Sequence, residues 1–313
     1  MARTCKETLI EKWAEQKHVC VGLDPVWEQM PECITAGYSG RGPKIKNFLV
    51  EIADATRDIA AAYKPNLAFY LAEGMQGLWA LQEVVNHIKC TSPGTPVILD
   101  GKFGDVGLTC EQYAKFAFDV LGVDAATVNP WGGKDDGLDA FFKREGKLVF
   151  VWCKSSNAGS AELQDISLPG GVRYRGKTDT GVDCLYDFVA KRIGSTESYP
   201  EEGWNENGNC GVVAGAGDFD WYAIDVIRSF VGGMPMLIPG IGAQGGDLGR
   251  AVTQAMHRDS KGGETNLPAI INSSRGILYA SGDKDFAEAS REAAVSLSDS
   301  ILEILDNERA KQL

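Results

Sequence analysis

Short apolar runs alternate with longer segments of helical periodicity along the whole chain. The runs are near-continuous rather than alternating, which is typical of strands buried on both faces of a parallel sheet. Eight strands are predicted, at 19–23, 61–65, 96–100, 125–129, 147–153, 211–215, 236–240 and 269–273. Helices are predicted within the first 17 residues and near 45–60, 72–90, 109–121, 135–145, 181–193, 219–231, 247–258 and 284–308.

Eight strands, each followed by a helix, predict a (β/α)8 TIM barrel that forms a single domain over residues 1–313. A doubly wound open sheet is the structural alternative. Three segments rich in Gly, Pro and polar residues exceed the minimal repeat and are expected to be insertions, at 26–44, 160–180 and 195–210. The insertion at 160–180 follows the fifth strand, on the face where barrels place their active sites, and is a candidate lid.

Composition and charge limit the classes of binding partner and the cellular location that the sequence allows. The formal net charge of -12 argues against nucleic acid and anionic membranes, which select basic surfaces. No stretch approaches the roughly 20 apolar residues of a membrane span, and charged residues in the first 17 positions argue against a secretory signal. The eight cysteines are scattered without a C-x-x-C pair, which favours free thiols and a cytoplasmic protein.

Polar residues gather at the ends of six predicted strands. In a parallel barrel these ends converge on one mouth, which is where barrel enzymes carry out catalysis. A single polar strand end is often structural, but six in one chain are hard to attribute to solvation. The segments are Leu23-Asp24-Pro25, Lys64-Pro65-Asn66, Asp100-Gly101-Lys102, Ser155-Ser156-Asn157, Pro239-Gly240 and Ser273-Ser274-Arg275.

The sharpest motif is Asp100-x-Lys102-x-x-Asp105. Side chains repeat with period two along a strand, so Asp100 and Lys102 are expected on one face. Carboxylates favour the charged form of a neighbouring lysine and fix its direction, which suits a proton donor. Alone, the motif is more simply explained as a salt bridge, but Asp24 and Lys64 at the preceding strand exits extend it into a network. Burying such a network costs roughly several kcal/mol per ion unless it is well paired, so proteins tend to keep one for function.

A second motif is the glycine-rich segment from Pro239 to Gly246, which contains Gly242 and Gln244, together with Arg275 after the eighth strand. The loops after strands seven and eight are the usual phosphate site of a barrel, and the arginine fork matches phosphate oxygens. The segment lacks the G-K-[ST] ending of a Walker loop and the Rossmann fingerprint.

Other candidates carry less weight. Trp131 and Trp152 are expected to be barrel packing or rim contacts. No group of His, Asp and Glu has the spacing of metal ligands, so no metal is predicted, although Asp24, Asp100 and Asp105 offer oxygen ligands for Mg²⁺ in principle.

Together these residues resemble a known family. LDGKFGDVGLT (99–109), LIPGIGAQGGD (237–247) and INSSRGILYA (271–280) resemble the signature regions of the orotidine 5'-phosphate decarboxylases. GLDP (22–25), KPNLAFY (64–70) and CKSSNAG (153–159) agree and occur in the expected order, so the resemblance covers essentially the whole chain. The details resemble the longer branch of the family that is common among bacteria.

The resemblance implies conversion of orotidine monophosphate to UMP and carbon dioxide in pyrimidine biosynthesis, without a cofactor. Lys102 would protonate C6 of the pyrimidine as carbon dioxide leaves. Asp100 would lie beside the departing carboxylate and, with Lys64, hold Lys102 in place. Asp105 and Thr109 would reach the site from the other subunit of a homodimer.

The resemblance also implies the contacts to the rest of the substrate. Asp24 and Lys64 would meet the ribose hydroxyls with help from Asn66, and Ser156 would bond the pyrimidine edge. The 5'-phosphate would be held by the remaining residues, which are Gln244 and Arg275 with the backbone around Pro239, Gly242 and Ser274.

Two other functions remain open. The first is a related barrel decarboxylase that acts on a sugar-acid phosphate, such as 3-keto-L-gulonate 6-phosphate, with Mg²⁺ at the carboxylates. Lys64 argues against it, since a metal site would favour a carboxylate there. The second is a non-catalytic nucleotide-binding barrel, against which the intact Lys102 and both aspartates argue.

Overall fold

The computed structural model describes residues 3–37, 39–174, 177–194, 203–217, 222–242, 245–257 and 266–311. Eight parallel strands form one sheet in the order β2-β1-β10-β9-β8-β5-β4-β3. Their bounds are β1 (Val19–Gly22), β2 (Ala60–Lys64), β3 (Ile98–Phe103), β4 (Ala125–Val128), β5 (Leu148–Lys154), β8 (Cys210–Ala214), β9 (Met236–Ile238) and β10 (Ala269–Ser273). Each predicted strand overlaps one of these, so the strand predictions are confirmed.

The sheet closes on itself between β2 and β3, the two ends of the strand order. Parallel bridges join Tyr63 to Val97 and Asn66 to Asp100. The Asp100 N–H donates to the Pro65 carbonyl at 2.9 Å across this seam. The (β/α)8 barrel prediction is confirmed, and the open sheet is excluded.

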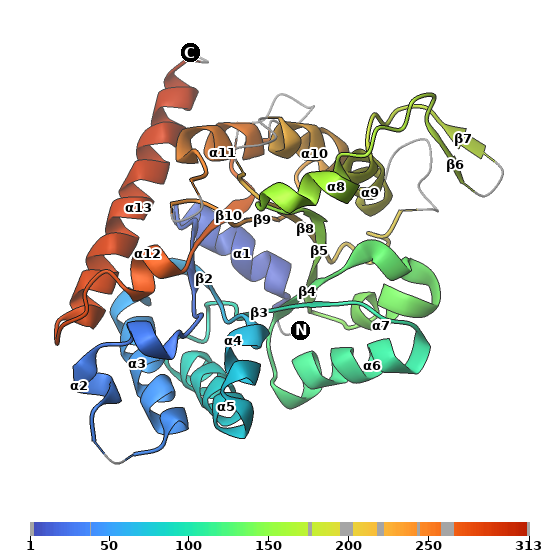
Figure 1. Ribbon diagram of the computed structural model, residues 1–313. Coiled ribbons are helices and arrows are strands. Elements are labelled where there is room, and N and C mark those ends of the chain that lie inside the picture. Colours follow the sequence, from blue (N-terminus) through green and yellow to red (C-terminus); the bar gives the residue numbers. More distant parts are fainter. Residues whose placement is uncertain are drawn as a thin grey trace.

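Helices surround the barrel (Figure 1). The principal ones are α3 (Arg41–Thr56), α5 (Gly74–Thr91), α6 (Gly107–Lys115), α7 (Asp139–Phe142), α9 (Leu185–Ile193), α10 (Ala223–Val231), α11 (Leu248–Ala255) and α13 (Phe286–Ala310), with α4 (Leu67–Ala72) after β2 and α12 (Arg275–Leu278) after β10. Each long helix turns an apolar stripe to the sheet, as α3 does with Ile45, Phe48, Leu49 and Ile52. No helix in the described ranges is long and apolar enough to cross a membrane.

Two predicted helices differ from expectation. The helix expected at 135–145 is only α7, because a turn, η4 (Lys134–Leu138), precedes it and Asp136 there has a φ of 58°. The helix expected at 109–121 is α6 followed by a π-helical turn, η2 (Phe116–Val120). The helix expected from 219 is described from Ala223, since residues 218–221 lie outside the described ranges.

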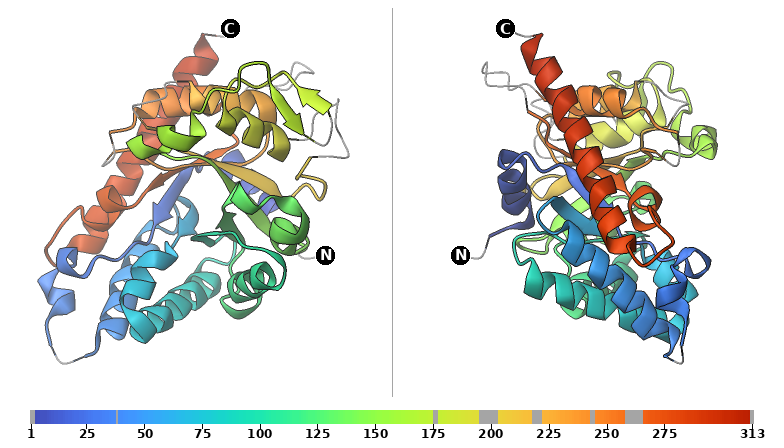
Figure 2. Two further views of the ribbon diagram at one scale, coloured as in Figure 1. Left: turned by 45° about the vertical axis from the view of Figure 1, so that its right-hand side comes forward. Right: turned by 90° about the vertical axis from the view of Figure 1, so that its left-hand side faces the viewer.

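The barrel has an inner and an outer core. Phe150, Leu237 and Ile270 fill the interior, and α1 (Cys5–Ala14) adds Cys5 and Leu9 to the same cluster. The helix α1 therefore closes one end of the barrel, while α2 (Glu32–Thr35) lies at the opposite end (Figure 2). The outer core fills the space between the strands and the surrounding helices.

The three extra segments carry short elements of their own. Segment 26–44 contains η1 (Trp27–Gln29), α2 and the first residues of α3. Segment 160–180 contains α8 (Ala161–Gln164) and an antiparallel hairpin of β6 (Val172–Tyr174) and β7 (Lys177–Asp179), after η5 (Ala158–Ser160). An ion pair between buried Lys154 and Asp165 attaches this insertion to β5. Segment 195–210 is described from residue 203, where the Trp204 side chain is buried.

Candidate active site

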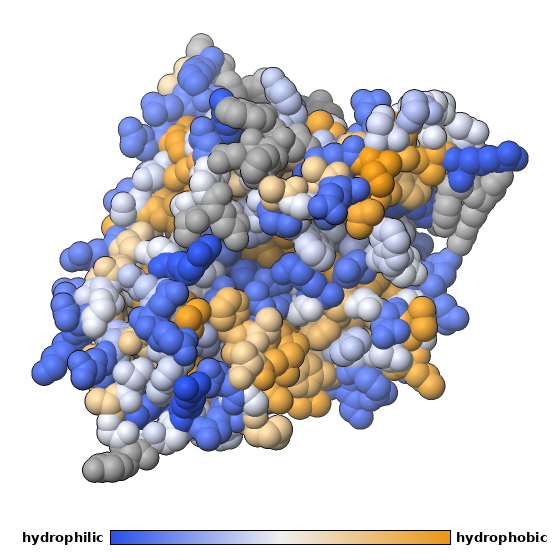
Figure 3. Space-filling view, in the orientation of Figure 1, coloured by the Kyte–Doolittle hydropathy of each residue, from blue (hydrophilic) through white to orange (hydrophobic). Residues whose placement is uncertain are grey.

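A cavity of about 520 Å³ opens at the mouth formed by the carboxyl ends of the strands. Figure 3 shows the mouth as a hollow lined with hydrophilic residues at the centre of the face. Its lining brings together nine of the residues singled out in the sequence, namely Asp24, Lys64, Asn66, Asp100, Lys102, Ser156, Pro239, Ser274 and Arg275. Val213, Leu237 and Asn272, from β8, β9 and β10, also line it.

A row of alternating charges crosses the seam between β2 and β3. The Asp100 carboxylate lies 3.2 Å from the Lys64 ammonium through one oxygen and 2.7 Å from the Lys102 ammonium through the other. The Lys64 and Asp100 side chains are only 4% and 9% exposed, whereas Lys102 is 34% exposed. Both lysines line the cavity, and the buried pair thus holds the more exposed of them, Lys102.

Burial and charge act in opposite directions on this row. Burial favours the neutral forms, but the carboxylates of Asp24 and Asp100 outweigh it and hold the pKa of Lys64 above its ordinary value. Burial likewise raises the pKa of Asp100, but the ammonium groups of Lys64 and Lys102 outweigh it. They hold the pKa of this carboxyl well below its usual range. Lys64 and Asp100 are therefore both charged at neutral pH.

Lys102 reaches its place through a bulge rather than a regular strand. The β3–β4 register pairs Leu99 with Ala126 and Phe103 with Val128, so three residues of β3 oppose one of β4. Lys102 has a φ of 44°, in the left-handed region. A Cβ at Gly101 would lie 2.3 Å from the Phe103 ring, so the bulge needs glycine there. The Asp100 and Lys102 side chains meet as expected, but a bulge rather than the regular period of a strand brings them together.

Two residues beside the charge row, on β4 and β5, make contacts that were not predicted from the sequence. Thr127, the single polar residue of β4, donates to Asp100 at 2.8 Å and accepts from the Lys102 N–H at 2.9 Å. Trp152, expected to be a packing or rim residue, lines the cavity with its ring centroid 5.5 Å from the Lys102 ammonium. A threonine inside an apolar run was a usable signal, whereas the role of Trp152 depends on how β5 faces β3.

The first strand supplies a second carboxylate. Asp24 accepts from the Asn66 N–H at 3.1 Å, and Asn66 in turn caps α4 through the Ala68 N–H. The Tyr279 hydroxyl, from the loop after β10, contacts the backbone of Asp24 and Val26. The carboxylate is thereby held next to Lys64.

The predicted phosphate side is more open. Gly22 of β1 must be glycine, because a Cβ there would lie 1.9 Å from the Ser274 hydroxyl. Arg275 is exposed, lines the cavity, and has no carboxylate partner in the part of the chain that the structure describes. Gly242, with a φ of 79°, is exposed and does not line the cavity, and Gln244 lies outside the described residues.

Asp105 and Thr109 do not reach the cavity of their own chain. Both are exposed, at the start of α6, and neither lines the cavity. The Asp105 carboxylate accepts from the Val106 N–H at 2.7 Å. They lie beside an apolar patch that Figure 3 shows over α4, α5 and the start of α6. The exposed apolar residues of this patch are Leu71, Met75, Trp79, Val106 and Leu108.

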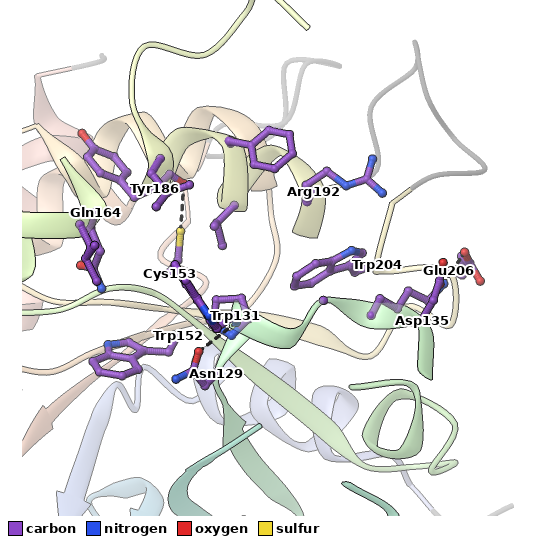
Figure 4. A pocket seen from close by; sticks show the side chains of 17 residues that line it. Asn129, Trp131, Asp135, Trp152, Cys153, Gln164, Tyr186, Arg192, Trp204 and Glu206 are labelled. Carbon is purple, nitrogen blue, oxygen red and sulfur yellow. Dashed lines mark hydrogen bonds and ion pairs between the residues drawn. The ribbon is translucent and has the colours of Figure 1, made fainter. Parts of the chain in front are cut away.

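A larger cavity, of about 740 Å³, lies beside the first and shares Trp152 with it. Figure 4 shows aromatic side chains around it, among them Trp131, Tyr186 and Trp204, with Arg192 at its edge. Size alone would favour this cavity, but the buried charges of Lys64 and Asp100 line only the smaller one. We therefore place the candidate active site in the smaller cavity.

No group of three or more His, Cys, Asp or Glu side chains in the described ranges is arranged to hold a metal ion. The carboxylates of Asp24 and Asp100 already have a positive partner, because the Lys64 ammonium interacts with both of them.

The fold and site define a (β/α)8 barrel protein with a lysine–aspartate–lysine row at its mouth, buried at Lys64 and Asp100, and an exposed arginine across the cavity. Residues 17–290 match the sequence model of the orotidine 5'-phosphate decarboxylase / HUMPS family. The chain belongs to this family.

Individual relatives are similar along nearly their whole length. The orotidine 5'-phosphate decarboxylase of Aromatoleum aromaticum is 38% identical over 283 residues, covering 90% of this chain and 92% of that protein. The protein of the same name from Azoarcus sp. is 39% identical over 285 residues, with coverage of 90% and 92%. The structure of Leishmania donovani OMP decarboxylase has a TM-score of 0.74 and 32% identity, covering 96% of this chain and 98% of that one.

Proposed function

We propose that this chain is an orotidine 5'-phosphate decarboxylase, a carboxy-lyase that converts orotidine monophosphate to UMP and carbon dioxide without a cofactor. The observation that most supports this proposal is the Lys64–Asp100–Lys102 row at the mouth of the barrel. Relatives that are named orotidine 5'-phosphate decarboxylase match 90% of this chain.

The row suits the chemistry of this reaction. When the bond between C6 and the carboxylate breaks, the electron pair stays on C6 and carbon dioxide leaves. A fixed ammonium stabilises such a carbanion electrostatically and then supplies the proton that makes UMP. Lys102 is the exposed end of the row and is the proposed donor, while Asp100 and Lys64 hold it. Solvent then returns a proton to Lys102.

The remaining substrate contacts combine residues that line the cavity with the glycine-rich loop after β9. Asp24 and Lys64, with Asn66, meet the ribose hydroxyls, and Ser156 meets the pyrimidine edge. Arg275 holds the phosphate with Ser274, Pro239 and the loop that contains Gly242 and Gln244. The phosphate is remote from the bond that breaks, so its binding energy can organise the site.

The decisive experiment mixes the purified protein with orotidine monophosphate and EDTA and follows the absorbance change. Conversion to UMP at a rate independent of EDTA supports the proposal and rejects the Mg²⁺-dependent sugar-acid phosphate decarboxylase. No conversion by folded protein, with turnover of a sugar-acid phosphate on addition of Mg²⁺, would overturn it. UMP binding without turnover of either substrate would favour a non-catalytic nucleotide-binding barrel.

We further propose a homodimer in which Asp105 and Thr109 enter the partner's site. Both are exposed and turned away from their own cavity, and Val106 and Leu108 beside them are 64% and 76% exposed. Large exposed apolar side chains clustered on one face are typical of an interface. A two-fold axis would bring each start of α6 to the other mouth.

Complementation tests the shared site. Lys102→Ala and Asp105→Ala each inactivate both sites of their own homodimer. After mixing and exchange, half the molecules are mixed dimers with one intact site, so about a quarter of the native activity should return. No return, despite exchange verified by mass spectrometry, would contradict the shared site.

The free cysteines favour a reducing compartment, and we propose a cytoplasmic protein. All eight cysteines are unpaired, and five of them are buried, where burial raises the pKa of each thiol and suppresses its reactivity. We also propose that residues 1–313 act as one domain, with the insertions at 26–44, 160–180 and 195–210 belonging to the barrel.

A further inference from the structure

Thr127 of β4 contacts both the bulge of β3 and the Lys64–Asp100–Lys102 charge row. It is fully buried in β4, between Ala126 and Val128, and opposes the three bulged residues of β3. A hydroxyl buried among apolar residues is unfavourable unless it is hydrogen-bonded. Within the described part of the chain, this hydroxyl makes two hydrogen bonds to the bulge, one to the Asp100 side chain and one to the Lys102 backbone.

The direction of both hydrogen bonds follows from their partners. The Lys102 N–H can only donate, so the Thr127 oxygen accepts from it at 2.9 Å. The ionised Asp100 carboxylate can only accept, so the single hydroxyl proton is donated to it at 2.8 Å. This donation goes to the same carboxylate oxygen that contacts the Lys102 ammonium at 2.7 Å.

On the side of β4 the bulge has no comparable support from the strand ladder. Between Leu99 and Phe103 the regular pairing with β4 is interrupted, and Lys102 keeps a φ of 44° that a residue with a Cβ rarely adopts. Strained backbone persists only where surrounding contacts hold it. Without the hydroxyl, the Lys102 N–H loses its acceptor, and a shift of register would turn the lysine to the other face of the strand.

We propose that Thr127 is a positioning residue, whose hydroxyl fixes both the Asp100 carboxylate and the left-handed backbone of Lys102 so that the ammonium points into the cavity. This inference rests on the proposed decarboxylase function for its kinetic consequence, while the backbone consequence stands independently. Thr127 is part of the cavity wall, but its side chain is fully buried and carries no charge, so it acts through the two neighbours that it bonds, Asp100 and Lys102.

The kinetic test compares Thr127→Val with Thr127→Ser. Valine keeps the shape and removes the hydroxyl, and kcat should fall on the order of 10- to 100-fold, because a group acting on the transition state is misplaced. Serine keeps the hydroxyl and should retain kcat within about threefold. The Kd for UMP should stay within about twofold in both variants, since the ribose and phosphate contacts are unaltered.

Thr56→Val is the matched control. Thr56 is also a fully buried threonine whose hydroxyl donates to a backbone carbonyl, but it lies on α3 outside the cavity. This substitution should lower the stability while leaving kcat unchanged. Equal loss of kcat in the valine and serine variants of Thr127, unchanged kcat in the valine variant, or UMP binding that weakens in parallel with kcat would each overturn the proposal.

Crystal structures of the native protein and the Thr127→Val variant give a second measurement that needs no activity. The native Lys102 should show a positive φ, and the variant should lose it or lengthen the contact between Lys102 and Asp100. An unchanged bulge in the variant would overturn the proposal. If the native protein fails to decarboxylate orotidine monophosphate, the proposed function fails, and this backbone comparison still decides the role of Thr127.

Discussion

The two sides of the cavity are built differently. At the seam of β2 and β3, Lys64 and Asp100 are buried, paired and bonded to each other before any ligand arrives. Across the cavity, after β9 and β10, Arg275 is exposed and the neighbouring loop carries glycines with positive φ, such as Gly240 and Gly242. The first side resembles a protein interior, and the second resembles a surface.

This difference suggests a division of labour. Preorganised charges need no rearrangement at the moment of reaction, which is what electrostatic catalysis requires. An open arginine and glycine-rich loop can instead close around an anion, so that binding energy remote from the reacting bond organises the site. The β2–β3 side should therefore govern kcat and stability, and the β9–β10 side should govern binding.

Lys102→Ala gives the largest expected effect and tests the first side. Turnover should fall by roughly 10⁴-fold or more, because the proton donor and the charge that stabilises the carbanion are both lost. The Kd for UMP, measured by calorimetry, should change little. Lys143→Ala, which removes an exposed lysine with a single carboxylate partner, is the control and should behave as native. A parallel loss of UMP binding would contradict the assignment of turnover to one side of the cavity and binding to the other.

Asp100→Asn should destabilise the fold by about 3–5 kcal/mol at neutral pH, because it leaves the buried Lys64 with less opposing charge. A carboxyl with a lowered pKa stabilises the fold above its unfolded value near 4, and that contribution is lost as the pH falls toward the lowered pKa. A lysine with a raised pKa contributes below about 10 and loses its contribution as the pH rises through the raised pKa. Urea unfolding of both proteins should therefore give a constant difference between about pH 4 and 10 that shrinks in acid.

Asp58→Asn is the control for this measurement. The ion pair of Asp58 with Arg291 lies on the surface and lowers the pKa of that carboxyl to about 2. Its removal should cost no more than about 1 kcal/mol. A similar cost for both substitutions would show that burial of the Asp100 row has no energetic consequence.

Arg275→Ala tests the second side and should have the smallest effect of the three. The value of kcat/KM for orotidine monophosphate should fall about 100-fold, since two hydrogen bonds to a charged phosphate are lost. Activity on orotidine, which lacks the phosphate, should not change. Arg309→Ala, on the exposed end of α13, is the control. An equal loss with orotidine would mean that Arg275 acts on the reaction rather than on the phosphate.

Much of this site was predictable because strand direction is uniform in a barrel. Once eight apolar runs were identified, the residues after them had to meet at one mouth, and Asp24, Lys64, Asp100 and Arg275 do line one cavity. The position of Asp105 outside its own cavity was implied only by family resemblance, since period and spacing place it beside Lys102. Gln244 lies outside the described residues, so its place stays a prediction.

The sequence by itself determined which segments become strands and which charges stand at their ends, because burial on both faces demands continuous apolar runs. Only the tertiary structure decided the closure of β2 on β3, the bulge that turns Lys102 into the cavity, and the role of Thr127. These features arise from pairing between strands separated by whole helices. The strained backbone of Lys102 is held by a hydroxyl 25 positions away in the sequence. A contact of this kind produces no periodic pattern from which it could be predicted.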